Sequence, residues 1–74
     1  MRKVNLCNAN IGKKIKESRI NKGFDIIEFS RKLSVSKSSI NNWEKGFCLP
    51  TLENIVNICN LLGISVDELI LFEH

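Results

Sequence analysis

Apolar residues recur every three or four positions along the chain, in stretches separated by glycine, proline and serine. This spacing places the apolar side chains of each stretch on one face of a helix, and it predicts five amphipathic helices. The first is expected from about Ile11 to about Lys22, with Ile11 and Ile15 buried and Gly23 ending it. The pattern therefore predicts an all-α fold.

The second and third helices are expected close together. Asp25 and Glu28 form a capping-box pattern at the start of the second helix. A short turn over residues 34–36 follows, and a third helix from Lys37 to about Lys45 ends at Gly46. Two helices joined by a turn of three or four residues form a helix-turn-helix arrangement.

Two more helices complete the pattern. Pro50 and Thr51 start the fourth helix and Gly63 ends it, and its expected buried stripe is Leu52, Ile55, Val56, Cys59 and Leu62. Ser65 and Glu68 form a second capping box, which opens a fifth helix holding Val66, Leu69 and Ile70.

With 74 residues the chain holds one small core. Residues 1–10 lack helical periodicity, so we expect a flexible N-terminal arm followed by one domain over residues 11–74. No signal segment opens the chain and no apolar run is long enough to span a bilayer, which predicts a cytoplasmic protein that does not act at a membrane.

Charge is distributed unevenly. Residues 1–50 hold all 11 Lys and Arg and four acidic residues, a balance of +7, and residues 51–74 carry four acidic residues, giving −4 and a net +3. A basic first half favours a surface that faces a polyanion, although a chance gradient in a soluble protein gives the same numbers.

The chemistry-bearing residues are few. Cys7, Cys48 and Cys59 show no metal-ligand spacing, and the sole histidine is His74, at the last position. We expect no metal, no cofactor and no enzymatic activity.

The residues that agree with a known family extend over all five predicted helices. They are Ile11-Gly12, Ile15, Arg19, Gly23, Phe24, Phe29, Leu33, Val35-Ser36, Ile40, Trp43-Glu44, Gly46, Pro50-Thr51-Leu52, Leu62-Gly63-Ile64-Ser65 and Asp67-Glu68-Leu69. On these residues the chain resembles the Cro/repressor-type (Xre-like) helix-turn-helix family, to which the phage lambda and 434 repressors belong; both are also standard examples of this mode of DNA docking. The resemblance implies a sequence-specific double-stranded DNA-binding regulator, acting as a repressor.

The third helix has two expected faces. Ile40 and Trp43 are three apart and should pack in the core, which is favoured over stacking of Trp43 on a base. The other face is polar and free of carboxylates, a pattern that suits DNA and equally suits a helix in water. The resemblance implies DNA base contacts from Lys37, Ser38 and Asn42, and DNA phosphate contacts from Ser36, Asn41, Lys45 and the backbone at Gly46. It also implies an orienting ion pair between Arg19 and Glu44.

Three positions depart from the family pattern. The first position of the second helix is Ile26 where the family usually has a phosphate-contacting Gln, the turn has Ser34 in place of Gly, and the middle of the second helix has Ser30 in place of Ala. Ile26 keeps open an alternative function, a protein-interaction module such as an antitoxin or anti-repressor with weak DNA binding and a partner of unknown identity.

The C-terminal part carries a surplus of apolar residues. Ile58 and Leu61 fall outside the expected stripe of the fourth helix, and the apolar run 70–72 lies near the chain end. We expect a homodimer through the fifth helix and these C-terminal apolar residues, the alternative being that they complete the core of the monomer.

Overall fold

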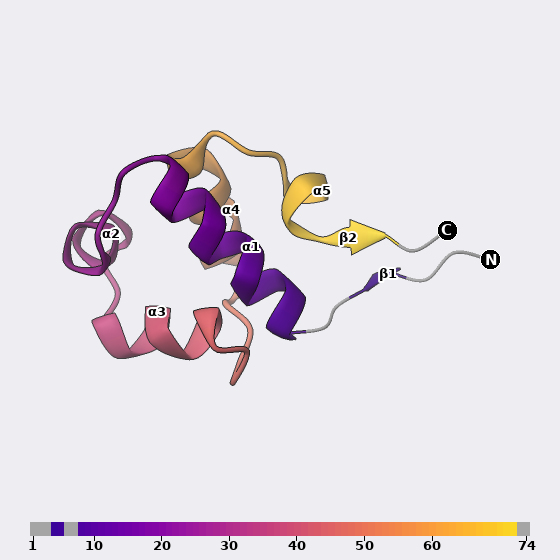
Figure 1. Ribbon diagram of the computed structural model, residues 1–74, viewed down its shortest axis with the longest axis horizontal. Coiled ribbons are helices and arrows are strands. Elements are labelled where there is room, and N and C mark those ends of the chain that lie inside the picture. The colour runs from indigo at the N-terminus through magenta and orange to yellow at the C-terminus, as the bar shows by residue number, and fades with distance from the viewer. Residues whose placement is uncertain (1–3, 6–7, 73–74) are drawn as a thin grey trace.

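The computed structural model describes residues 4–5 and 8–72 (Figure 1). Within these ranges the five predicted helices are present, and the all-α class is confirmed. Their bounds are α1 Asn8–Asn21, α2 Ile26–Leu33, α3 Lys37–Glu44, α4 Leu52–Leu62 and α5 Val66–Leu69. Helix α1 begins three residues before the predicted Ile11 and ends one residue before the predicted Lys22.

Side-chain caps explain where the later helices begin. The Glu28 amide donates to Asp25 Oδ1 at 2.7 Å, and the Ser39 amide donates to Ser36 Oγ at 3.1 Å. Thr51 caps α4 in the same way. At α5 the capping box is complete, with Ser65 and Glu68 each accepting from the other's amide. These bonds satisfy amides that a helix start leaves without partners.

The core gathers side chains from all five helices. Its fully or nearly fully buried apolar members are Ile11, Ile15, Phe29, Leu33, Ile40, Trp43, Ile55, Ile58, Cys59, Leu62 and Leu69. Ile40 and Trp43 are 0% and 5% exposed, so the predicted packing of Trp43 in the core is confirmed. Helix α3 packs against α1, and Figure 1 shows α2 end-on beside α3, so the two helices of the motif cross at a steep angle.

The predicted stripe of α4 is wrong at three positions. Leu52 and Val56 are 74% and 43% exposed, whereas Ile58 is fully buried. Leu61, also expected outside the stripe, is half-buried against the core. Two apolar stripes of helical period fit this segment, and α1, α2 and α5 pack on the one formed by Ile55, Ile58, Cys59 and Leu62.

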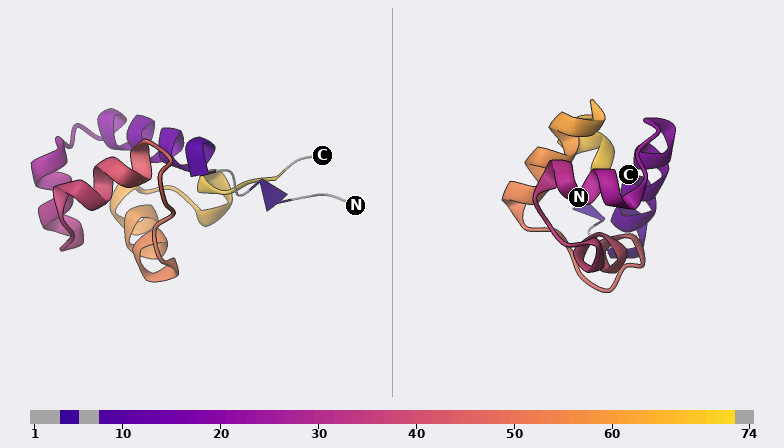
Figure 2. Two further views of the ribbon diagram at one scale, coloured as in Figure 1. Left: turned by 90° about the horizontal axis from the view of Figure 1, so that it is seen from below. Right: turned by 90° about the vertical axis from the view of Figure 1, so that its left-hand side faces the viewer.

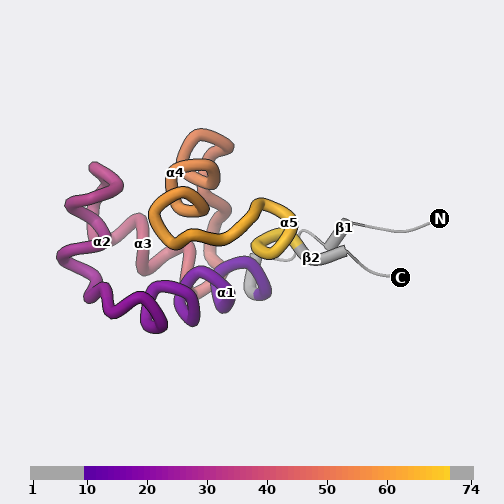
Figure 3. The backbone as a smooth tube through the Cα atoms, turned by 90° about the horizontal axis from the view of Figure 1, so that it is seen from above, coloured from indigo at the N-terminus to yellow at the C-terminus, as the bar shows by residue number. Residues whose placement is uncertain are grey.

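A short strand pair is the feature that the sequence did not predict. Strand β1, Val4–Asn5, pairs antiparallel with β2, Leu71–Phe72, in the register Val4↔Phe72 and Asn5↔Leu71. The pair lies at the end of the molecule away from α2 (Figure 1), and α5 is nearer to that end than α4 is (Figure 3). Strand β1 and the start of α1 thus fall within residues 1–10, for which a flexible arm is expected from the sequence, and Arg2 and Lys3 of that arm lie outside the described residues.

Among the described residues, no helix combines the length and the apolar character needed to cross a bilayer.

Candidate nucleic-acid interface

The turn between α2 and α3 has a left-handed residue at its first position. Ser34 has φ 57° and ψ 42°, and its amide donates to the Arg31 carbonyl at 3.2 Å. The Val35 amide donates to the Ser30 carbonyl at 3.0 Å, which closes the end of α2. A serine in this backbone region costs about 1–2 kcal/mol relative to the right-handed conformation. This strain accompanies the tight turn that sets the angle between α2 and α3.

Helix α3 exposes a polar side opposite its buried side. Lys37, Ser38 and Asn42, the predicted base-contacting residues, are all exposed. The helix lies along one outer surface of the molecule, and the loop that follows it is the only described segment beyond it (Figure 1 and Figure 2, left). A surface of hydroxyl, amide and ammonium donors without a carboxylate can donate to base edges and phosphates.

The predicted phosphate-contacting residues are arranged around the two ends of α3. Ser36 and Lys45 are exposed, and Asn41 is half-buried. The Gly46 amide donates to the Trp43 carbonyl at 3.1 Å, and the Phe47 amide donates to the Asn42 carbonyl at 2.9 Å. Because both amides are already used within the chain, Gly46 turns the backbone here and does not offer a free amide to a phosphate.

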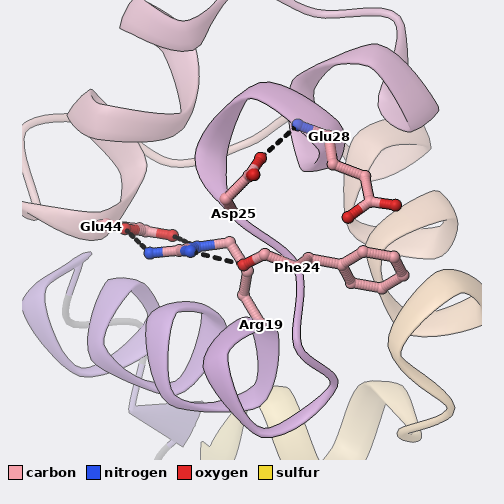
Figure 4. Close-up of polar contacts among 5 residues, drawn as sticks. All are labelled: Arg19, Phe24, Asp25, Glu28 and Glu44. Atoms are coloured by element: carbon pink, nitrogen blue, oxygen red, sulfur yellow. Dashed lines mark hydrogen bonds and ion pairs between the residues drawn. The ribbon is translucent and has the colours of Figure 1, made fainter.

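A buried ion pair fixes the C-terminal end of α3 to α1 (Figure 4). Arg19 Nε donates to Glu44 Oε2 at 2.8 Å, and a second guanidinium nitrogen donates to Glu44 Oε1 at 3.3 Å. The third nitrogen donates to the Phe24 carbonyl at 2.8 Å. The two side chains are only 9% and 6% exposed, so the expected pair is present and is not the solvated surface contact that would contribute little.

Gly12 holds α1 close to the same end of α3, a role that sequence reasoning missed. A Cβ at this position would lie 2.0 Å from the Trp43 carbonyl oxygen and 2.9 Å from the Glu44 carbonyl oxygen. Only glycine fits so close to another backbone. The available signal was a glycine inside an amphipathic helix, which costs about 1 kcal/mol relative to alanine and so needs a packing reason.

Ile26 packs inward where the family usually has a polar side chain. It is half-buried and lies against the hydrophobic core. Its side chain therefore contributes to the packing of α2 and offers no hydrogen bond to a phosphate. Ser30, the small residue in mid-helix, is buried, and its hydroxyl donates to the Ile27 carbonyl at 2.8 Å.

The remaining charge is divided between the helices. The lysines of α1, Lys13, Lys14, Lys16 and its neighbour Lys22, are exposed or half-exposed, as is expected for residues that attract DNA diffusely or simply face water. The acidic residues Glu53, Asp67 and Glu68 lie on α4 and α5. No group of three or more metal-ligating side chains occurs in the part of the chain that the structure describes.

Comparison with known proteins agrees with this geometry. The sequence pattern of a helix-turn-helix family matches residues 15–69. The HTH-type transcriptional regulator ImmR of Bacillus subtilis is 28% identical over 61 residues, which cover 82% of this chain and 48% of ImmR. The cryptic phage CTXphi transcriptional repressor RstR of Vibrio cholerae is 40% identical over 42 residues, which cover 57% of this chain and 38% of RstR. The chain thus spans about half the length of these relatives or less.

Among solved structures, the master regulator for biofilm formation SinR of Bacillus subtilis, in complex with DNA, superposes with a TM-score of 0.74 at 30% identity. The superposition covers 80% of this chain and 95% of that one.

Proposed function

Because the chain belongs to the Cro/repressor-type helix-turn-helix family, we propose that it is a sequence-specific double-stranded DNA-binding transcriptional regulator. It acts as a repressor and inserts α3 into the major groove as a homodimer. The observation that carries this proposal is the exposed, carboxylate-free side of α3, on a helix whose far side is fixed by Trp43 and the Arg19–Glu44 pair. SinR, at 30% identity, is a relative whose structure contains DNA.

Base reading is assigned to Lys37 and Ser38 at the start of α3 and to Asn42 one turn after Ser38. Lys37 donates to guanine O6 or N7, Asn42 pairs with adenine N6 and N7, and Ser38 donates to or accepts from either kind of base. One good bidentate contact discriminates against a wrong base by about 1–3 kcal/mol.

Phosphate contacts set the register of α3 in the groove. Ser36 and Asn41 donate from the side chain, and Lys45 supplies a charge at the helix end. At Gly46 the contribution is the turn that brings the following loop toward the DNA backbone, since its amide is bonded within the chain. With Ile26 in place of the usual Gln, the protein makes one phosphate contact fewer than is usual in the family.

Repeated selection from random-sequence duplexes, followed by anisotropy titration at two salt concentrations, tests this function. We expect a two-fold-symmetric site with half-sites about 10–10.5 bp apart, and an affinity that falls steeply as salt rises. Weak binding without enrichment of any sequence would refute the regulator function.

Ile26 favours a second candidate function, a protein-interaction module such as an antitoxin or anti-repressor. The observation is that its side chain packs in the core and leaves the usual phosphate-contacting position apolar. A complex with a protein partner that does not weaken with salt, together with the absence of any selected DNA site, would support this candidate.

A protein that binds DNA acts in the compartment that holds the DNA, and this agrees with the expected cytoplasmic location. Both candidates are binding functions and require no catalysis.

A further inference from the structure

A Schellman motif, a hydrogen-bonded cap built around a glycine in the left-handed backbone region, closes the C-terminal end of α3. Gly46 has φ 80°, and its amide donates to the Trp43 carbonyl at 3.1 Å. The Phe47 amide donates to the Asn42 carbonyl at 2.9 Å. These are the two bonds that define the motif when Lys45 is the C-cap. The motif therefore fixes the backbone of Phe47 against the last turn of α3.

Phe47 lacks the apolar partner that frequently accompanies this motif. The second residue after the C-cap commonly makes a hydrophobic contact with a residue three or four positions before the cap. In this chain those two positions hold Asn42 and Asn41, which are polar, and Phe47 is 72% exposed. Exposure of one apolar side chain is ordinary by itself. Here, however, the motif holds the aromatic ring next to two residues that are assigned to DNA contacts.

The assignments of the two asparagines indicate what covers the ring. Asn42 is assigned to a base and Asn41 to a phosphate, and the deoxyribose lies between base and phosphate along a DNA strand. The deoxyribose has apolar C–H groups and no charge, so it suits an aromatic ring. The loop that holds Phe47 also extends past α3 on the outer surface along which α3 lies (Figure 1 and Figure 2, left). A DNA duplex that receives α3 therefore meets this loop as well.

We propose that Phe47 is a further DNA-contacting residue, which packs against a deoxyribose at the edge of the major groove. The inference rests on the proposed function for the docking of α3 and adds to it a contact without charge. Such a contact strengthens binding to every sequence, because every nucleotide of DNA has the same sugar. It neutralises no phosphate and releases no counterion, so its contribution to the affinity does not fall as salt rises.

Anisotropy titrations over a range of salt concentrations test this contact, with the selected DNA site and a random-sequence duplex as the two probes. We expect Phe47→Ala to bind both duplexes about tenfold more weakly, as the loss of most of one buried aromatic side chain predicts. The decrease of affinity with rising salt should stay as steep as in the wild type. Lys45→Ala should make that decrease less steep, because it removes a cation.

Two further variants separate the aromatic ring from unrelated effects of the substitution. Phe47→Leu keeps a large apolar side chain and should retain most of the affinity. Ile27→Ala is the matched control, since Ile27 is an apolar residue of α2 that is 55% exposed and lies outside the loop. It should bind both duplexes as the wild type does. An Ile27→Ala protein weakened as much as Phe47→Ala would overturn the assignment.

Single ribonucleotides, placed one at a time along each DNA probe, identify the sugar. A 2′-hydroxyl adds a polar group to the deoxyribose, and burial of that group without a partner is unfavourable. At one position of each bound module we expect the wild type to bind at least about fivefold more weakly, whereas Phe47→Ala should be insensitive there. Sensitivity to uracil in place of thymine that disappears in Phe47→Ala would instead indicate a thymine methyl group and overturn the sugar contact.

Failure of this contact and failure of the proposed function give different results. A selected site that Phe47→Ala binds as tightly as the wild type overturns the sugar contact and retains the regulator. If no sequence is selected, and Phe47→Ala still weakens binding to the random-sequence duplex without changing its salt dependence, the contact is retained and the regulator is overturned.

Discussion

Arg19 joins three parts of the molecule through one guanidinium group. Its nitrogens reach the Glu44 carboxylate at the end of α3 and the Phe24 carbonyl before α2. Both charges are buried, so the pair as a whole adds little to the free energy of unfolding. Removing one member alone is strongly destabilising, because the other charge is then buried without a partner. The pair thereby holds the end of α3 in register with α1.

We expect Arg19→Met and Glu44→Gln each to lower the free energy of unfolding by about 3–5 kcal/mol, because each leaves a buried partner unpaired. The double variant Arg19→Met/Glu44→Gln should lose less than the sum of the two single changes. Urea unfolding followed by circular dichroism measures this. Additive losses would show that the two side chains are not coupled.

Ser34 is the one non-glycine residue with positive φ among the described residues. Ser34→Gly should raise the free energy of unfolding by about 0.5–1 kcal/mol, since glycine adopts this conformation without a clash but loses more entropy on folding. Ser34→Ala is the control and should give no gain. A Ser34→Gly protein less stable than the wild type would contradict the strain at this turn.

Cys59 gives the stability a dependence on pH. Burial, with a smaller contribution from the Glu68 charge, raises the pKa of the Cys59 thiol above its usual value. The folded state therefore holds this proton more tightly than the unfolded chain. The stabilisation is complete below about pH 8.5 and is lost as pH rises through the folded-state pKa. In a Cys7→Ser/Cys48→Ser background, Cys59→Ala should abolish that alkaline loss in urea titrations; an unchanged slope would contradict the assignment to Cys59.

At the scale of elements, close contact between α1 and α3 is what fixes the reading helix. Gly12 allows it, because a larger residue would collide with the carbonyl oxygens of Trp43 and Glu44. Helix propensity alone favours Gly12→Ala by about 1 kcal/mol. A rise in the free energy of unfolding of Gly12→Ala would mean that helix propensity dominates. A fall would mean that the collision with α3 dominates.

Gly12→Ala should destabilise the protein by about 1–3 kcal/mol or more, as overpacking does, and should also weaken DNA binding by displacing α3. Lys16→Ala, at an exposed position of the same helix, is the control and should change stability little. Thermal unfolding compares the two. A more stable Gly12→Ala protein would mean that the helices do not approach this closely.

Local signals were sufficient to predict most elements but not all contacts between them. The caps Asp25, Ser36, Thr51 and Ser65 lie where the sequence indicated, because a cap depends on residues three positions away. The phase of α4 was wrong, since two stripes share the helical period and only packing decides between them. The β1–β2 pair joins segments 66 residues apart through two-residue strands, too short to carry an alternating pattern.

At the scale of the whole molecule, all 11 Lys and Arg lie in the sequence from Arg2 to Lys45, and the charged residues of α4 and α5 are all acidic. The polar side of α3 and the buried Arg19–Glu44 pair behind it form one arrangement. This arrangement exposes hydroxyl, amide and ammonium donors along one side of α3. The family resemblance predicted Lys37, Ser38 and Asn42 as base-contacting residues, and all three side chains are exposed on α3. The sequence pattern was wrong in placing Leu52 and Val56 in the core, since both are exposed.

The measurement that tests the central claim most directly compares Asn42→Ala with Lys45→Ala on the selected DNA site and on all of its single-base variants. Asn42→Ala should remove discrimination at one base pair of each half-site, by about 1–3 kcal/mol, because we assign Asn42 to a base contact. Lys45→Ala should weaken binding to every sequence alike and reduce the salt dependence, because we assign Lys45 to a phosphate contact. Equal losses on every sequence for both variants would contradict the claim that this side of α3 reads DNA.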